Sequence, residues 1–236
     1  LGRYEEAARW LEESLAIGRE LGDRAHVARV LQPLGLAAFG RGDVDASRTY
    51  MEEAADLARE SGDKRELAAA LNGLAQLHRV EGELDAAEPL YDRVVRLARE
   101  SGDSEAIAIG LLNLAMVSIG RGTGDRARPM LIEVVTIALE IGSRPVGQSA
   151  LDVSAGYGAW LGEWERAARF FGAADAQAVE IGLQRDPTDE SFLMPLIDRA
   201  RVELGAEGFA LAERAGRALT YEQSVGEARA WLARAP

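Results

Sequence analysis

Glycine recurs every 40 residues along this chain, in two series that are offset by half a period. One series is Gly2, Gly42, Gly82, Gly122 and Gly162, and the other is Gly22, Gly62, Gly102, Gly142 and Gly182. A fixed period of this length is typical of stacked repeats, because each copy is a small unit that buries its apolar face against the next copy. Five copies without an insertion indicate that the repeat is the fold itself.

Each repeat contains two amphipathic helical stretches. In residues 63–102, apolar side chains recur at spacings of three and four in both halves of the unit, as on the buried face of a helix. Asp63 can cap the first helix, and Gly82 can end it in the left-handed conformation that glycine adopts without steric cost. No segment shows the two-residue alternation of a strand. The unit is therefore predicted to be a helical hairpin and the chain to be all-α.

Aligning the copies reveals columns of constant side-chain size. Only small residues occur five positions after the first glycine of each unit, and only large apolar residues occur four positions further on. Small and large positions side by side predict helices that approach closely and interdigitate. The two columns are Ala7, Ser47, Ala87, Ala127 and Ala167, and Leu11, Met51, Tyr91, Leu131 and Phe171.

This pattern resembles the tetratricopeptide repeat. The resemblance rests on those two columns, the turn glycine and a leucine column in the first helix, with a small residue four positions after each leucine. That family usually has units of 34 residues, and the longer unit here resembles the variant of kinesin light chains and of the bacterial maltose-regulon activator. The leucines are Leu31, Leu71, Leu111 and Leu151.

The resemblance implies a right-handed superhelical solenoid of antiparallel helix hairpins over residues 1–182. The repeats would be a half unit, 1–22, followed by the units 23–62, 63–102, 103–142 and 143–182. Because the array begins inside a unit, we expect the chain to be a fragment of a longer polypeptide.

Two copies depart from the pattern. Gly124 stands where the other units have an apolar residue, so the fourth hairpin is expected to lose a contact at its turn. In the fifth unit Ser154 replaces a leucine, and Gly156 and Gly158 each lower helix propensity by about 1 kcal/mol relative to alanine. We therefore expect residues 143–160 to be the loosest helix of the array.

The chain leaves the 40-residue period after Gly182. Three shorter helices are predicted beyond it, and residues 183–236 would form a C-terminal helical cap over the last apolar face of the array. These helices are 189–204 and 206–218, separated by Gly205, and a third that ends near Trp231 and is capped by Thr220 with Gln223.

The cap carries a second resemblance. The runs 168–174, 199–205 and 216–223 are similar to the C-terminal region of large bacterial signal-transducing ATPases, many of which are LuxR-type transcriptional regulators. The resemblance implies that the chain is the sensor or partner-binding arm of such a protein. None of the ATPase or DNA-binding motifs lies in this sequence, so neither activity is assigned to it.

The composition excludes several classes of function. The formal charge of −12, from 27 basic and 39 acidic residues, disfavours nucleic acid and anionic membranes as direct partners. No apolar run approaches the roughly 18 residues that span a bilayer. Cysteine is absent, which excludes disulfides and thiolate metal sites and fits a cytoplasmic protein. The glycine-rich segment 120–125 lacks the lysine of a phosphate-binding loop and is interpreted as a repeat turn.

Catalytic groupings are not evident. The two histidines, His26 and His78, have no serine–aspartate or metal-ligand spacing around them, so we assign them structural roles. The glutamates at positions 20, 60, 100, 140 and 180 form one repeat column, which we interpret as a solvated helix end. We therefore predict a non-catalytic protein with no metal and no cofactor.

The concave face remains as the candidate functional surface, because first helices line it in tetratricopeptide folds. A polar floor in the first two units, followed by an apolar stretch, suits a peptide segment or partner helix that binds through a few anchors, and it could also hold a small effector. Two alternatives stay open, an assembly scaffold without an effector and, remotely, an enzyme built on helical hairpins. The implied groove positions are Arg29, Gln32, Leu36, Phe39, Asn72, Gln76, Arg79, Ile109, Leu112, Met116, Ile119, Ser149, Asp152 and Trp160.

Overall fold

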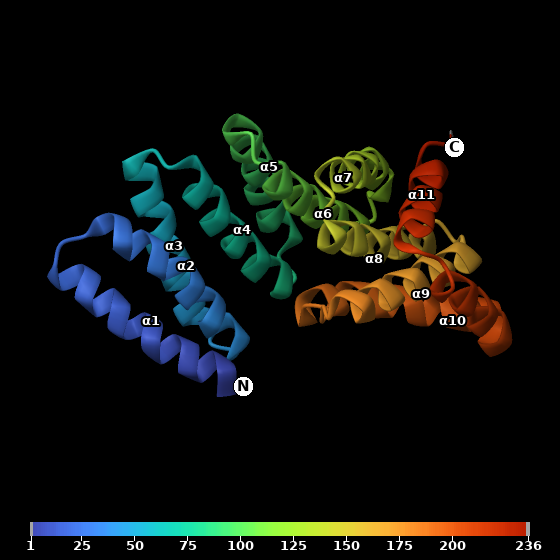
Figure 1. Ribbon diagram of the computed structural model, residues 1–236, viewed down its shortest axis with the longest axis horizontal. Coiled ribbons are helices and arrows are strands. Elements are labelled where there is room, and N and C mark those ends of the chain that lie inside the picture. The colour runs from blue at the N-terminus through green and yellow to red at the C-terminus, as the bar shows by residue number, and fades with distance from the viewer. Residues whose placement is uncertain (1, 235–236) are drawn as a thin grey trace. The chain divides into compact units, whose positions relative to one another are not determined.

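The computed structural model describes the backbone of residues 2–234 and the side chains of residues 5–234. Every regular element in this range is helical, as the sequence predicts (Figure 1). The chain divides into two compact units, Leu1–Gly110 and Leu111–Pro236, and the division falls inside helix α6 (Ser104–Gly120). None of the described helices combines the length and the apolar character needed to cross a membrane.

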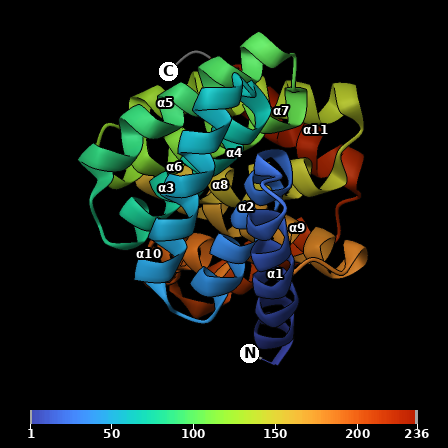
Figure 2. The same ribbon diagram turned by 90° about the vertical axis from the view of Figure 1, so that its left-hand side faces the viewer.

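The first unit is built from successive antiparallel helices that pack on their sequence neighbours. Figure 2 shows α1, α2 and α3 lying side by side, and contacts between α1 and α2, α2 and α3, α3 and α4, and α4 and α5 run through the unit in chain order. Besides the start of α6, it contains α1 (Gly2–Glu20), α2 (Arg24–Gly40), α3 (Val44–Ser61), α4 (Lys64–Val80) and α5 (Leu84–Ser101).

The glycine period is a period of left-handed turns. Nine glycines of the two series, from Gly22 to Gly182, have φ between 66° and 82°, whereas Gly2 is the first residue of α1. Side-chain caps stand beside several of these turns, where an aspartate or serine oxygen accepts a hydrogen bond from the first turn of the helix. Each such cap stabilises its helix by about 1 kcal/mol. The capping residues are Asp23, Asp43, Asp63, Asp103 and Ser143.

The small and large columns pack as the sequence predicts. Ala87 and Tyr91 are completely buried, and Met51 fills the space beside two glycines of neighbouring first helices. A Cβ atom added to Gly35 or Gly73 would lie 2.8 Å or less from atoms of the Met51 side chain. Ala7 is the exposed member of its column, because α1 has no first helix of its own hairpin among the described residues.

The glutamate column is not simply a solvated helix end. In three hairpins the glutamate forms an ion pair with the first residue of the same hairpin's first helix. These pairs are exposed, so each contributes between about 0 and 1 kcal/mol. They are Arg24 with Glu60, Lys64 with Glu100 at 3.0 Å, and Arg144 with Glu180 at 2.5 Å.

The second unit combines the remaining repeats with the C-terminal cap. Its elements are the end of α6, a 3₁₀ turn (Gly124–Arg126), α7 (Ala127–Ile141), α8 (Arg144–Trp160), α9 (Trp164–Ile181), α10 (Pro187–Arg217) and α11 (Tyr221–Leu232). The boundary expected at residue 182 lies inside this unit, where α10 packs on α9. Gly205, with φ 72° and ψ 160°, breaks α10 into two helical segments at the predicted position. Thr220 and Gln223 form the predicted capping box of α11.

The expectation that the fourth hairpin loses an apolar contact at Gly124 is wrong. The indole ring of Trp160 occupies the space where a side chain would be, since a Cβ atom at Gly124 would lie 2.7 Å from the ring. Tyr157 stacks on the same indole with ring centroids 5.9 Å apart. The turn therefore gains a tryptophan from another helix in place of its own apolar residue.

The packing of α8 contradicts the expectation that residues 143–160 form the loosest helix. Twelve of its 17 residues are buried. Its glycines allow neighbouring helices to approach closely, since Gly156 lies against the ring of Phe192 and Gly158 against the backbone of Ala167. Their low helix propensity is offset by this close packing, which the repeat pattern of one helix does not reveal.

Two further glycines bring α9 and the second segment of α10 into backbone contact. A Cβ atom at Gly172 would lie 2.2 Å from the carbonyl oxygen of Glu213, and one at Gly216 would lie 1.9 Å from that of Arg169. Both glycines belong to the runs whose similarity to signalling ATPases is noted above. Within this fold, their role is to let two helices cross closely.

Candidate functional site

A cavity of about 320 Å³ lies on the first unit between α4, α5 and the start of α6. Three of the predicted groove residues, Gln32, Asn72 and Ile109, line it together. Its apolar lining is Ala68, Ala69, Val94, Ala98, Ala106 and Ile109, and its polar lining is Gln32, Arg65, Glu66, Asn72, Ser101 and Asp103.

Helical spacing explains why these residues meet. The lining positions 66, 69 and 72 of α4 are three residues apart, as are 103, 106 and 109 at the start of α6. Residues at this spacing lie on one side of a helix, one above the other. The two first helices therefore present parallel rows of side chains, and the C-terminal half of α5 closes the space between them.

A second depression, of about 630 Å³, lies beside the cavity on the same unit. It is formed by the start of α2, the end of α3 and the turn before α4, and Arg29 is the predicted groove residue in its lining. Glu66 lines both spaces. Glu66 thus borders two hollows of the surface.

The two carboxylates that line the cavity, Glu66 and Asp103, differ in their partners. Asp103 accepts a hydrogen bond from the amide of Ala106 and lies 3.9 Å from Arg65, whereas no hydrogen bond or ion pair joins the Glu66 carboxylate to any described residue. Burial raises the pKa of the Glu66 carboxyl, the nearby Asp63 raises it further, and Arg29 partly opposes both.

The other groove residues predicted in the first unit do not line either space. Leu36 is exposed, and Phe39, Gln76 and Arg79 are partly buried on α2 and α4. Arg65, Glu66 and Asp103 line the cavity but were not predicted. Their only signal in the sequence is their place at the starts of α4 and α6, which does not distinguish a cavity from a helix end.

The groove residues predicted in the second unit are engaged in its own packing. Leu112, Met116 and Ile119 are buried, with exposed fractions of 6%, 4% and 3%. Seven of the nine residues from 111 to 119 are apolar, and all nine are buried, as expected for a helix that is apolar on most of its circumference. Ser149 is partly exposed, and Trp160 covers Gly124.

Asp152 forms a largely buried ion pair that the sequence did not indicate. Arg185, in the segment that follows α9, donates from Nε to both carboxylate oxygens at 3.0 and 2.9 Å. The buried Gln148 donates to the same carboxylate at 2.7 Å, and Arg185 also lies over the ring of Phe171. Burial raises the pKa of Asp152 although these two donors oppose the shift. The pair fastens the segment before α10 to α8.

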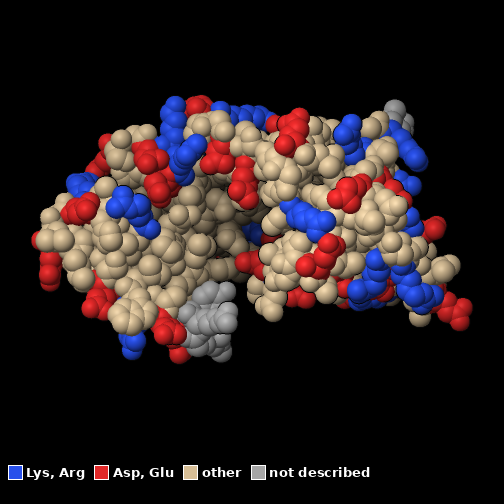
Figure 3. Space-filling view, viewed as in Figure 1, with Lys and Arg blue, Asp and Glu red and all other residues tan. Residues whose placement is uncertain are grey.

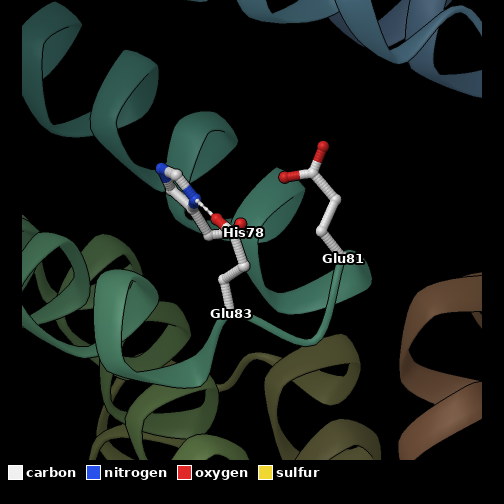
Figure 4. A group of neighbouring side chains, drawn as sticks. All are labelled: His78, Glu81 and Glu83. Atoms are coloured by element: carbon white, nitrogen blue, oxygen red, sulfur yellow. Dashed lines mark hydrogen bonds and ion pairs between the residues drawn. The ribbon is translucent and has the colours of Figure 1, made fainter.

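One group of side chains has the composition of a metal site. His78, Glu81 and Glu83 bring their ligand-type atoms within 4.8 Å of one another (Figure 4). His78 Nδ1 and the Glu83 carboxylate are 2.7 Å apart, and Arg48 donates to Glu81 at 2.5 Å. A cation would have to break both interactions, so this cluster is better explained as a set of surface ion pairs.

Charge is distributed unevenly between the two units. Residues 1–110 contain 22 acidic and 14 basic side chains, whereas residues 111–236 contain 17 and 13. On the face shown in Figure 3, both signs are interspersed and no broad basic patch is seen. The acidic excess therefore belongs mainly to the unit that carries the cavity.

Comparison with known proteins agrees with this architecture. The family model of the tetratricopeptide repeat matches residues 1–60 and 27–100, so the first hundred residues are similar to that family. No curated protein matches the chain in sequence. Among solved structures, BtubC (BKLC) from P. vanneervenii matches with a TM-score of 0.64 and 18% identity, over 99% of this chain and 94% of that chain. At this identity the likeness shows the all-helical repeat fold alone.

Proposed function

We propose that the chain is a non-catalytic protein-interaction module whose first unit binds a peptide segment or a helix of a partner. The observation that carries this proposal is the cavity between α4, α5 and the start of α6, which is lined by three of the predicted groove residues and lies mainly in the part of the chain that is similar to the interaction-mediating tetratricopeptide repeats. Helical repeat proteins bind partners on the extended surfaces that their stacked units create. A small apolar hollow with a polar rim suits one or two anchor side chains of such a partner.

The chemistry of the cavity favours binding over catalysis. Its described lining contains no histidine, and the hydroxyl of Ser101 donates to the carbonyl of Ala98. A nucleophile needs a base within hydrogen-bond reach, and here that hydroxyl is used in the helix itself. The same space is at the lower end of the range for small-molecule sites, so a small effector is the second kind of occupant that its size admits.

Within a larger protein, this module would be the sensor or partner-binding arm of a cytoplasmic bacterial signalling or transcription-regulating ATPase. The support for this context is the similarity of the runs 168–174, 199–205 and 216–223 to such proteins. A deletion of the repeats from the full-length protein should abolish its response to partners or effectors. If the deleted and intact proteins respond alike, the regulatory role is refuted, and stable partners without any effector-induced thermal shift would favour an assembly scaffold.

The binding site itself can be tested by filling the cavity. Ala69 is partly exposed on α4, so Ala69→Phe should occupy the hollow while the helix remains intact. The ligand would be a peptide selected from a random library on the whole chain, and its affinity would be measured by calorimetry. The matched control is Ala16→Phe, an exposed position of α1 outside the cavity. Equal binding by both variants would refute the site.

A further inference from the structure

We infer that the cavity of the first unit recognises a basic side chain of its partner, arginine in preference to lysine, with the carboxylate of Glu66 as the counter-charge. The inference rests on the proposed function and specifies the chemistry of the partner. It follows from the position of Glu66, the pairing of the surrounding charges and the apolar lining of the cavity.

Glu66 differs from the other carboxylates of this surface because its own charge is unpaired among the described residues. Glu60 pairs with Arg24, and Asp103 with Arg65. Asp63 accepts hydrogen bonds from the backbone amides of two residues at the start of α4. Of the carboxylates that line the two spaces, only Glu66 is partly buried and makes neither kind of contact with the described part of the chain.

The environment of Glu66 makes an incoming cation favourable. Partial burial and the field of Asp63 both disfavour its ionised form, and they raise the pKa of this carboxyl. Arg29 of α2 acts on Glu66 through its field, yet it is exposed and makes no ion pair with it. A guanidinium in the cavity would therefore complete a charge-assisted hydrogen bond that the chain itself leaves open.

The apolar lining suits the stem of such a side chain. Ala69 and Ala106 are partly exposed, Val94 and Ala98 line the cavity with 2% and 1% of their surface exposed, and Ile109 is 41% exposed. Long basic side chains bury their methylene stems along apolar surface while the charged head reaches a polar group. The planar fork of arginine can also donate twice to one carboxylate, which is the reason to expect arginine before lysine.

The charge of the whole unit supports the same partner. An excess of eight acidic residues in the first 110 positions attracts a cationic segment and raises its association rate. An acidic segment would instead be repelled by Glu66 and Asp103 in the cavity. Arg65, the basic residue of the lining, already pairs with Asp103 and so does not offer a free positive charge.

The test begins with peptides selected from a random library on the whole chain, and arginine or lysine between apolar residues should be enriched. The best peptide is then compared with a copy in which citrulline, the neutral analogue, replaces arginine. Glu66→Gln should weaken the arginine peptide roughly tenfold, as expected for a hydrogen bond between charged groups, and should leave the citrulline peptide unchanged. Glu52→Gln, an exposed position of α3 with the same change of charge, should alter both affinities less than about twofold.

The outcomes separate this inference from the proposed function. If Ala69→Phe abolishes binding while Glu66→Gln acts no more strongly than Glu52→Gln, the cavity is a binding site but the basic anchor is refuted. If neither cavity variant changes the affinity, the proposed site fails as well. A charge-reversed pair provides a check against misfolding, because Glu66→Lys should lose the arginine peptide and recover binding to a peptide with glutamate at the anchor. Enrichment of peptides without basic residues would overturn the inference.

Discussion

Replacing Gly216 by alanine should force apart two helices of the second unit. An ideal Cβ atom at this position lies 1.9 Å from the carbonyl oxygen of Arg169, 2.8 Å from its carbonyl carbon and 3.0 Å from the amide nitrogen of Ala173. All three atoms belong to the backbone of α9, so no rotamer change can relieve the contact. The helices would have to separate by roughly 1 Å, and a closely packed protein interior resists a displacement of this size.

Two opposing effects set the size of the loss. Overpacking a tight contact costs about 1–3 kcal/mol and occasionally more, and this contact lies toward the upper end because the obstacle is backbone. Replacing glycine inside a helix returns about 1 kcal/mol of helix propensity. We therefore expect a net destabilisation of about 2 kcal/mol, which lowers the melting temperature by roughly 4–8 °C in a chain of this length.

A second glycine of the cap provides the control. Gly226 lies in α11, and a Cβ atom added there would meet nothing within 4 Å. Gly226→Ala should therefore stabilise the chain by up to about 1 kcal/mol. Both variants would be compared by urea unfolding followed through circular dichroism. The reasoning is refuted if Gly216→Ala is as stable as Gly226→Ala.

Three further substitutions test other parts of the structure. Gly124→Leu, which restores the repeat pattern, should destabilise the chain by about 1–3 kcal/mol because it displaces the indole of Trp160. A shift in tryptophan fluorescence should accompany the loss, and a gain in stability would contradict the packing described for Trp160. Ala87→Leu should cost a similar amount at a completely buried helix contact, and an unchanged melting temperature would disprove the register of the columns. Arg169 donates two hydrogen bonds to Glu227 and lowers the pKa of that carboxyl. Glu227→Gln should therefore lower the free energy of unfolding above pH 4.5, and this difference from the unchanged chain should disappear as the pH falls through the lowered pKa. The loss should stay below about 1 kcal/mol because the pair is partly exposed, and a difference that does not change with pH would exclude this ion pair as its cause.

The elements that the sequence predicts well are those with local causes. A glycine that ends a helix, an aspartate that caps the next one and a column of alanines each act within one hairpin, so the period alone is enough to place them. Gly62 and Asp63 illustrate this, since the first adopts the left-handed conformation and the second accepts hydrogen bonds from the following helix.

The features that the sequence did not reveal come from contacts outside the repeat register. Arg185 follows the last repeat, so no column could pair it with Asp152. The ring of Trp160 in α8 fills the space beside Gly124, so the departure at Gly124 cannot be interpreted from its own hairpin alone. Glu66 lies in the first turn of α4, and its position beside a cavity depends on residues of α5 and the start of α6 that are far from it in the sequence. Such contacts join residues that are far apart in the sequence, and they leave no periodic pattern that a single sequence could reveal.

The repeated turns have a consequence for the handedness of their residues. At Gly22, Gly62, Gly102, Gly142 and Gly182 the backbone has positive φ, yet an added Cβ atom would meet nothing within 4 Å. The requirement for glycine at these sites is thus one of chirality and not of space. The positive φ of these turns is the favoured backbone conformation of a mirror-image residue such as D-alanine, which would also have less freedom than glycine to lose on folding. The glycines of this series therefore mark turns whose backbone conformation either glycine or a D residue can adopt.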